Sequence, residues 1–268
     1  MKHWSFSLCM GSLLLSLLIF ISIFAPLLAP YNPYLPDMAH RLASPSLTHW
    51  LGTDALGRDI LSRLLYGGRV TLRIAFLSST IALGLGLFAG IMAGYIGGFV
   101  DEIITMMTQI FLSVPSICLM VTIAGLFGGG ENSLLLGTVL VSWASLSRII
   151  RMEALRFRKA SFVEGLYAMG AGNLRILFIH ILPHLGKTLF TLGALRMGRI
   201  ALAISGLSFL GLGVRPPTPD WSVMIADAMT YWRGYPHLVL SPGIAILMLV
   251  LSLQLIAQGL SKGSEQNI

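Results

Sequence analysis

Residues 74–96 read IAFLSSTIALGLGLFAGIMAGYI and contain no charged side chain. An α-helix rises about 1.5 Å per residue, so about 20 apolar residues cross a hydrocarbon core about 30 Å thick. Gly86, Gly90 and Gly94 recur in this run at every fourth position, and Gly98 continues the series just beyond it. Small residues at this spacing let helices approach closely in lipid. The run therefore predicts a membrane-spanning helix whose glycine face packs on another helix of the chain.

Further apolar stretches have the same character, and they cover residues 8–28, 103–127, 134–149, 185–212 and 238–260. The stretch 185–212 contains Lys187, Arg196 and Arg199, which are costly at the centre of a bilayer. Counting about 20 residues back from Leu212 puts both arginines in the first turns, which favours snorkelling to the membrane surface. The alternative is that an arginine faces a polar path. We expect an all-α polytopic membrane protein with six transmembrane helices.

The composition supports a single membrane domain. The 268 residues are 55% hydrophobic and 11% charged, whereas soluble domains are about 25% charged. The net charge of +7 comes from Lys and Arg between the apolar runs, which indicates membrane topology and argues against nucleic-acid binding. Cys9 and Cys118 lie in apolar runs and predict neither a disulfide framework nor a metal site.

The basic segment between the fifth and sixth stretches sets the expected orientation. It runs from Arg148 to Lys187, and the positive-inside rule places it in the cytoplasm. An even number of spans then puts both termini there as well. The predicted organisation is a first transmembrane helix with a short cytoplasmic N-terminus (1–29), a periplasmic loop with an interfacial helix (30–69), a transmembrane core (70–260) and a cytoplasmic tail (261–268).

The cytoplasmic loop 152–184 is too long for a plain connection between two spans. Residues 160–169 predict a short helix carrying Glu164, which Gly170 ends in a left-handed turn. A second helix is expected from Asn173 until Pro183 interrupts its hydrogen bonding. A long, structured loop of this kind indicates a cytoplasmic partner.

The residues EGLYAMGA at 164–171, followed by HILP at 180–183, resemble the cytoplasmic motif of ABC importer permeases. That motif has Glu-Ala-Ala, then Gly, then a later Ile-x-Leu-Pro. Gly165 and Leu166 depart from the two alanines. In the family this loop forms the coupling helix that docks on the ATPase subunit. The resemblance implies that coupling to the ATPase involves Glu164, Gly165, Ala168, Gly170, Ala171 and Pro183.

Further motifs resemble the dipeptide/oligopeptide/nickel branch of that family: HWLGTD at 49–54, GRD at 57–59, SFLGLG at 208–213, PT at 217–218 and Trp221. The resemblance implies the type I ABC importer permease fold and a multi-pass protein of the bacterial inner membrane. It also implies the partners: a second homologous permease subunit, two ATPase subunits that bind ATP and Mg, and an extracytoplasmic substrate-binding protein. The chain is not expected to be an enzyme, and neither catalytic residues nor a cofactor or metal of its own is expected.

Two outer segments are interpreted from their patterns. Around residues 53–64 the pattern predicts an interfacial helix. Its apolar face toward lipid would be Leu56, Ile60 and Leu64, and its charged face toward headgroups would be Arg58, Asp59 and Arg63. After the SFLGLG run, Asp220, Trp221 and Asp227 are hypothesised to help form the external mouth, with a plain solvated surface as the alternative.

The substrate is the least determined feature of the sequence. Related peptide permeases often have a Glu just before SFLGLG, where this chain has Ile204, and this favours nickel or a metal chelate. Import of di- or oligopeptides remains an alternative, and a passive channel or membrane scaffold is the alternative of another class. The triplet Gly186-Lys187-Thr188 lacks the rest of a phosphate-binding loop, and His180 with His184 lacks the Glu of a zinc-protease motif.

Overall fold

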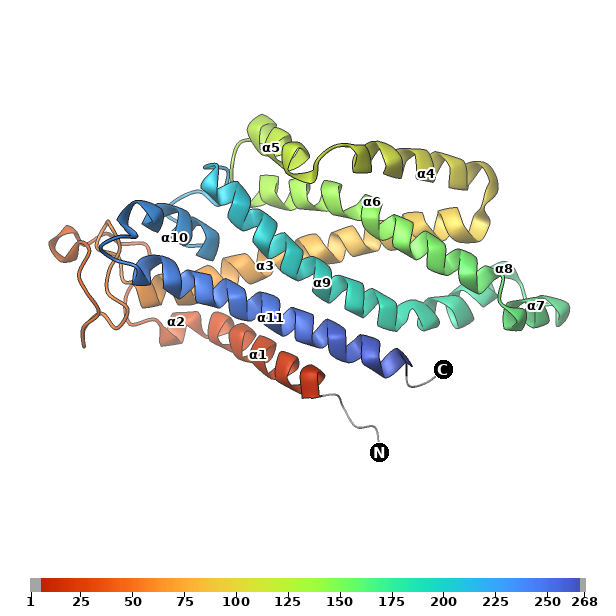
Figure 1. Cartoon of the computed structure of the whole chain (residues 1–268), viewed down its shortest axis with the longest axis horizontal. Helices are drawn as coiled ribbons and strands as arrows, with labels where there is room; N and C mark the ends of the chain where they lie inside the picture. Colours follow the sequence, from red (N-terminus) through yellow and green to blue (C-terminus); the bar gives the residue numbers. More distant parts are fainter. Residues whose placement is uncertain (1–5, 266–268) are drawn as a thin grey trace.

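The computed structural model describes residues 6–265, and the elements of regular secondary structure in that range are all helices. Figure 1 shows long helices that run roughly along the long axis of the molecule. These are α1 (Phe6–Ile23), α3 (Ile60–Ile91), α6 (Glu131–Arg158), α9 (Leu182–Phe209) and α11 (His237–Glu265). A turn of π-helix, η2 (Met92–Ile96), extends α3. Five helical segments are long and apolar enough to cross a membrane: Phe6–Ile23, Ile60–Ile96, Glu131–Arg158, Thr188–Phe209 and His237–Ser261.

The sixth expected span is not a straight helix. It consists of α4 (Gly98–Ser113) and α5 (Ser116–Phe127), which meet at an angle of 86°. Pro115 causes the break because a proline pushes the preceding residue out of the helical region, and Val114 is indeed extended. The prediction of one continuous helix over 103–127 was therefore wrong at this point.

Helices α3 and α6 pack through the glycine series. A Cβ on Gly86 would lie 2.6 Å from the Leu146 Cβ, and one on Gly90 would lie 2.7 Å from the Ser147 carbonyl oxygen. At Gly94 the same atom would lie 2.5 Å from the Arg151 carbonyl oxygen. Gly98 differs, because it begins α4 with a φ of +57° and has no atom within 4 Å of a Cβ. The glycines at 86, 90 and 94 thus bring α3 and η2 against α6, while Gly98 serves the turn into α4.

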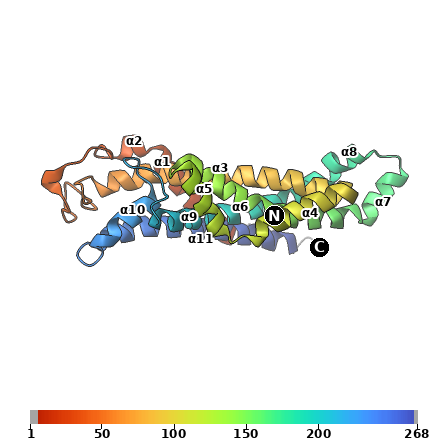
Figure 2. The same ribbon diagram turned by 90° about the horizontal axis from the view of Figure 1, so that it is seen from above.

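The remaining helices complete a bundle with distinct ends. The short α2 (Ala25–Leu28) continues α1. Helix α1 packs along α11, and a Cβ on Gly11 of α1 would lie 2.7 Å from the Ser252 carbonyl oxygen of α11. At one end lie α10 (Trp221–Ala228), the loop after α2, and the 3₁₀ turns η1 (Met38–His40) and η4 (Met229–Tyr231). At the other end lie α7 (Ser161–Ala168) and α8 (Asn173–Arg175), and the ends of α1 and α11 nearest the termini point toward that end without reaching it (Figures 1 and 2).

The apolar segment of α9 begins and ends earlier in the chain than the span counted back from Leu212. It covers Thr188–Phe209, and the helix itself begins at Leu182. Arg196 and Arg199 consequently occupy the middle of the span. By length and composition, this placement differs from the first turns, where both arginines were expected.

Candidate functional site

Helix α7 is fixed to the bundle by its inner face and by its C-terminal cap. Val163 is fully buried in a cluster with Ile91, Tyr95, Ile150, Ile176, Ile181 and Leu185. The helix ends as predicted at Gly170, whose φ is +82°. The Gly170 amide donates to the Tyr167 carbonyl at 2.9 Å and the Ala171 amide to the Leu166 carbonyl at 3.0 Å. This pair of bonds defines a Schellman cap, which suits glycine because other residues are strained at positive φ.

The outer face of α7 is exposed to solvent. Ser161, Glu164, Gly165 and Ala168 follow helical spacing and are all exposed. A Cβ on Gly165 would meet no atom within 4 Å. The coupling residues proposed from the sequence thus fall into two groups. Glu164, Gly165 and Ala168 form the exposed surface, and Gly170 and Ala171 form the cap that orients it.

Tyr95 joins α7 to the transmembrane part of the molecule, and sequence reasoning did not identify it. Its hydroxyl lies 3.0 Å from the Tyr167 hydroxyl of α7 and donates to the Asn173 carbonyl of α8, also at 3.0 Å. Tyr95 belongs to η2, which continues α3. One hydroxyl therefore ties the long helix to both short ones. The only signal in the sequence is a tyrosine near the end of an apolar run.

Pro183 does not end a helix, contrary to expectation. Asn173–Arg175 leads into the π turn η3 (Ile176–Ile181), and α9 continues from Leu182 through Pro183. The Leu182 amide donates to the Leu177 carbonyl, five residues back. Proline is tolerated in the first turn of a helix, and a π turn widens the backbone just before it. Pro183 is exposed, so its position leaves it available at the surface beside α7.

At the opposite end, the GTDALGRD segment folds into a compact loop instead of an interfacial helix. Asp59 caps α3 by accepting from the Ser62 amide at 2.8 Å. Asp54 pairs with Arg58 at 2.7 Å and with Arg63 at 3.4 Å, and we call these three residues the outer charge cluster. The side chains of Arg58 and Arg63 are only 8% and 3% exposed, so the expectation that they face headgroups was wrong. Ile60 is likewise buried in the core.

Helix α10 is attached to α3 by the residues proposed for the external mouth. Asp220 is fully buried, accepts from Thr71 Oγ1 at 2.6 Å, and caps α10 by accepting from the Ser222 and Val223 amides. Trp221 is also buried and donates from Nε1 to the Leu64 carbonyl at 2.8 Å. These contacts attach α10 to α3 through Asp220 and Trp221, and neither side chain is exposed.

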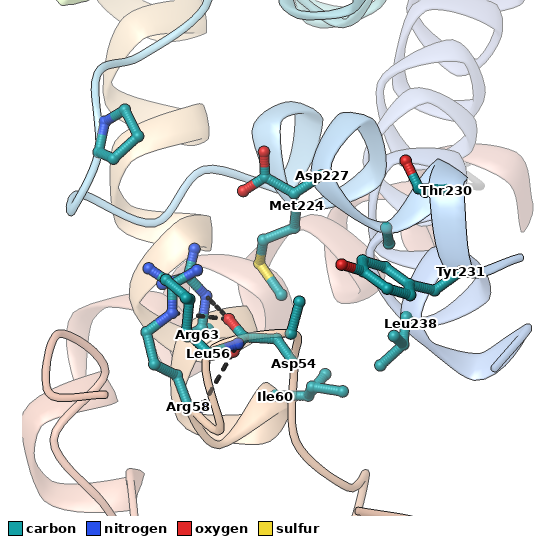
Figure 3. Close-up of a pocket in the computed structure, with 13 residues that line it drawn as sticks. Asp54, Leu56, Arg58, Ile60, Arg63, Met224, Asp227, Thr230, Tyr231 and Leu238 are labelled. Atoms are coloured by element: carbon teal, nitrogen blue, oxygen red, sulfur yellow. Dashed lines mark hydrogen bonds and ion pairs between the residues drawn. The ribbon is translucent and has the colours of Figure 1, made fainter. Parts of the chain in front are cut away.

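Asp227 lines a pocket of about 380 Å³ between α10 and the outer charge cluster. Figure 3 shows Asp227 on α10 with Arg58, Arg63 and Asp54 across the pocket. Burial raises the pKa of the Asp227 carboxyl, and the nearby Arg63 and Arg58 offset that rise only in part. Of the three proposed mouth residues, Asp227 is the exposed one.

Comparison with known proteins agrees with this geometry. A family model for the inner membrane component of binding-protein-dependent transport systems matches residues 86–266. The chain belongs to that family. The dipeptide transport system permease protein of Alkalihalophilus pseudofirmus is 35% identical over 250 residues, which are 93% of this chain and 82% of the relative. The nickel transport system permease protein of Escherichia coli K12 is 35% identical over 259 residues, 97% of this chain and 93% of the relative.

Two further matches agree in class and fold. The glutathione transport system permease protein of Escherichia coli O157:H7 is 32% identical over 260 residues, which are 96% of this chain and 86% of the relative. A chain from an inward-facing structure of the MetNI methionine ABC transporter matches with a TM-score of 0.59 at 16% identity, covering 78% of this chain and 98% of that one. The protein is an ABC importer permease of the inner membrane and a transport component, not an enzyme. The passive-channel and scaffold alternatives are set aside.

Proposed function

We propose that this chain forms half of a translocation path, with a second homologous permease subunit forming the other half. Of two ATPase subunits, which bind ATP and Mg, one would dock on the exposed face of α7 and the other on the second permease, and an extracytoplasmic binding protein would deliver the solute. The observation that carries the proposal is the division of α7 into two faces. Val163 anchors the inner face in the bundle, while Glu164, Gly165 and Ala168 present an unoccupied outer surface.

This assignment also orients the protein in the membrane. The ATPase subunits act in the cytoplasm, so α7, α8 and both termini would be cytoplasmic, while α10 and the outer charge cluster would face the periplasm. The basic residues on either side of α7 support this orientation under the positive-inside rule. ATP-driven closure would then reach the helices as a rigid-body movement through α7.

For the substrate, we propose nickel or a metal chelate, with di- or oligopeptides as the second candidate. Ile204 is fully buried among apolar neighbours, at the position where related peptide permeases often have a Glu. The nickel permease relative supports the first candidate, and the equally identical dipeptide permease relative supports the second.

Charge reversal on the outer face of α7 tests the coupling role. Glu164→Lys should reduce co-purification of the ATPase subunits and binding-protein-stimulated ATP hydrolysis, because it changes the charge of the docking surface without touching the inner face. Glu102→Lys is a matched control, since Glu102 is an exposed acid on α4 outside the loop. Wild-type assembly and stimulation in the Glu164→Lys complex would reject the assignment.

A further inference from the structure

Arg199 lies on a face of α9 that the other described helices leave open. The face has helical spacing and comprises Thr188, Leu192, Leu195, Arg199, Leu202 and Gly206. None of these residues is buried, and a Cβ on Gly206 would meet no atom within 4 Å. The opposite face of α9, including Ala201 and Ile204, packs in the core. The open face is therefore a surface that something outside this chain must cover or hydrate.

The depth of Arg199 follows from its place in the span and from its neighbours. It lies near the middle of the 22-residue span Thr188–Phe209, at about 15 Å from either end. A Cβ on the adjacent Gly198 would lie 3.9 Å from Val250 Cγ1 and 3.8 Å from Leu253 Cδ1. Val250 and Leu253 are both near the middle of the α11 span His237–Ser261. The Gly193 carbonyl accepts from Ser79 Oγ at 3.0 Å, and Ser79 is central in Ile60–Ile96. Two neighbouring helices thus place this part of α9 at mid-membrane depth.

A second arginine strengthens the positive charge at this level. Arg196, one turn from Arg199, donates from Nη2 to Ser145 Oγ of α6 at 2.7 Å. Among the side chains that the structure describes, the ion pairs are formed by other residues and none includes Arg196 or Arg199. A serine hydroxyl carries no charge, so the two guanidinium groups have no balancing carboxylate among the described side chains.

An exposed guanidinium at mid-membrane depth cannot face hydrocarbon at equilibrium, and it lies too far from either surface to snorkel. The open face of α9 must therefore adjoin water or a polar partner. We propose that Arg199, supported by Arg196, forms an anion-binding site in the translocation path and accepts a carboxylate of the transported solute. This inference rests on the proposed function and narrows its substrate class.

The chemistry selects among the candidate substrates. A guanidinium binds a carboxylate through parallel, charge-assisted hydrogen bonds, and two uncompensated arginines repel a bare divalent cation. Nickel would accordingly pass as a chelate whose ligands carry free carboxylate groups, and a peptide would pass with its C-terminal carboxylate toward Arg199. Both remaining candidates share this anionic group. Free Ni²⁺ and a peptide amide lack this anionic group.

Uptake by the complete transporter in proteoliposomes, with its second permease, ATPase subunits and binding protein, tests the site. The probes are nickel citrate, nickel chloride, dialanine and dialanine amide. We expect the wild type either to prefer nickel citrate over nickel chloride or to prefer dialanine over dialanine amide. Arg199→Gln should lower that uptake at least about 10-fold, the loss expected for a charged hydrogen bond, and Arg199→Lys should retain part of it. Arg233→Gln, at an exposed outer-loop residue, is the control and should behave as wild type.

Labelling provides a readout that does not need the right solute. In a Cys9→Ser, Cys118→Ser background, Arg199→Cys should react with a water-soluble methanethiosulfonate, and faster with an anionic reagent than with a cationic one because Arg196 remains. Absence of reaction would show that the face is closed to water and overturn the site, as would wild-type uptake by Arg199→Gln or preferred uptake of free Ni²⁺. Loss of the second permease from the Arg199→Gln complex would also overturn it by assigning the arginine to a subunit contact. Failure of the wild-type complex to bind ATPase subunits would instead reject the proposed function.

Discussion

The hydroxyl groups of Tyr95 and Tyr167 lie 3.0 Å apart, and this contact connects a transmembrane helix to the helix proposed to meet the ATPase. Tyr95 donates its proton to the Asn173 carbonyl, so Tyr167 is the donor between the two hydroxyls. Loss of the Tyr95 hydroxyl therefore removes both bonds, whereas loss of the Tyr167 hydroxyl removes one.

Tyr95→Phe should consequently impair transport more than Tyr167→Phe. Each lost hydrogen bond is worth about 0.5–1.5 kcal/mol, and the double variant should resemble Tyr95→Phe because the shared bond is lost only once. The measurement is solute uptake per ATP hydrolysed, together with hydrogen exchange in α7. Equal effects of the two single variants would contradict the shared-donor arrangement.

Gly170→Val should lower transport by about 5- to 30-fold, as expected when a strained φ costs about 1–2 kcal/mol at the cap of α7. The membrane domain should remain folded, as judged by monodisperse elution in detergent, because the cap lies outside the bundle. Gly172→Ala is the companion variant. Gly172 has an ordinary φ of −73° and no atom within 4 Å of its Cβ position, so this change should leave transport unchanged. Transport at the wild-type rate by Gly170→Val would argue against a coupling role for this cap.

Gly90→Leu should destabilise the membrane domain by about 1–3 kcal/mol or more, because the new side chain would overlap the Ser147 backbone and Ile150 of α6. Gly84→Leu provides the matched control in the same helix, since no atom lies within 4 Å of its Cβ position. Thermal unfolding in detergent should separate the two variants. Similar midpoints would mean that α3 and α6 do not pack as closely as the structure shows.

Asp220→Ala should destabilise α10 by about 0.5–2 kcal/mol through loss of its N-cap, and more if the Thr71 hydroxyl stays unpaired. Limited proteolysis of the loop around α10 would report this loss. Asp220→Asn retains an acceptor and should recover part of the stability. Equal protease resistance of wild type and Asp220→Ala would show that the cap contributes little.

Asp227→Asn should leave stability unchanged and instead reduce binding-protein-stimulated ATP hydrolysis if the carboxylate belongs to the mouth. The raised pKa means that this carboxyl is protonated at a higher pH than an ordinary Asp. Binding-protein stimulation of the wild type should therefore decline as the pH falls through that raised pKa. The Asp227→Asn variant should not show this pH-dependent decline. An unchanged pH profile would favour a plain solvated surface.

The membrane-spanning helices and the cap of α7 could be predicted because local physical rules control them. Uncharged runs such as residues 74–96 must be helical in lipid, and Gly170 stands where a helix needs a positive φ. The break at Val114 had a visible signal in Pro115, but the apolar run on both sides concealed it. Pro183 carried the same signal and had the opposite outcome, because a π turn accommodated it.

Features that depend on tertiary contacts could not be predicted in this way. The alternation of charged and apolar residues around Arg58 is compatible with an amphipathic helix, and only the fold shows that Asp54 neutralises the arginines in a buried loop. Tyr95 and Asn173 are far apart in the sequence, so nothing local indicates their hydrogen bond. Asp220 likewise depends on Thr71, which lies in a different helix.

The continuity of Ile60–Ile96 has a mechanical consequence. This helical segment has 37 residues, so its length is about 55 Å, and it begins beside the outer charge cluster and ends at Tyr95. A rod of that length converts each degree of tilt at one end into a displacement of about 1 Å at the other. A small rotation imposed through Tyr167 would thus be amplified at the far end, where Arg63 lines the pocket. The same helix would act as a lever arm on which the ATPase side and the solute-receiving side are opposite ends.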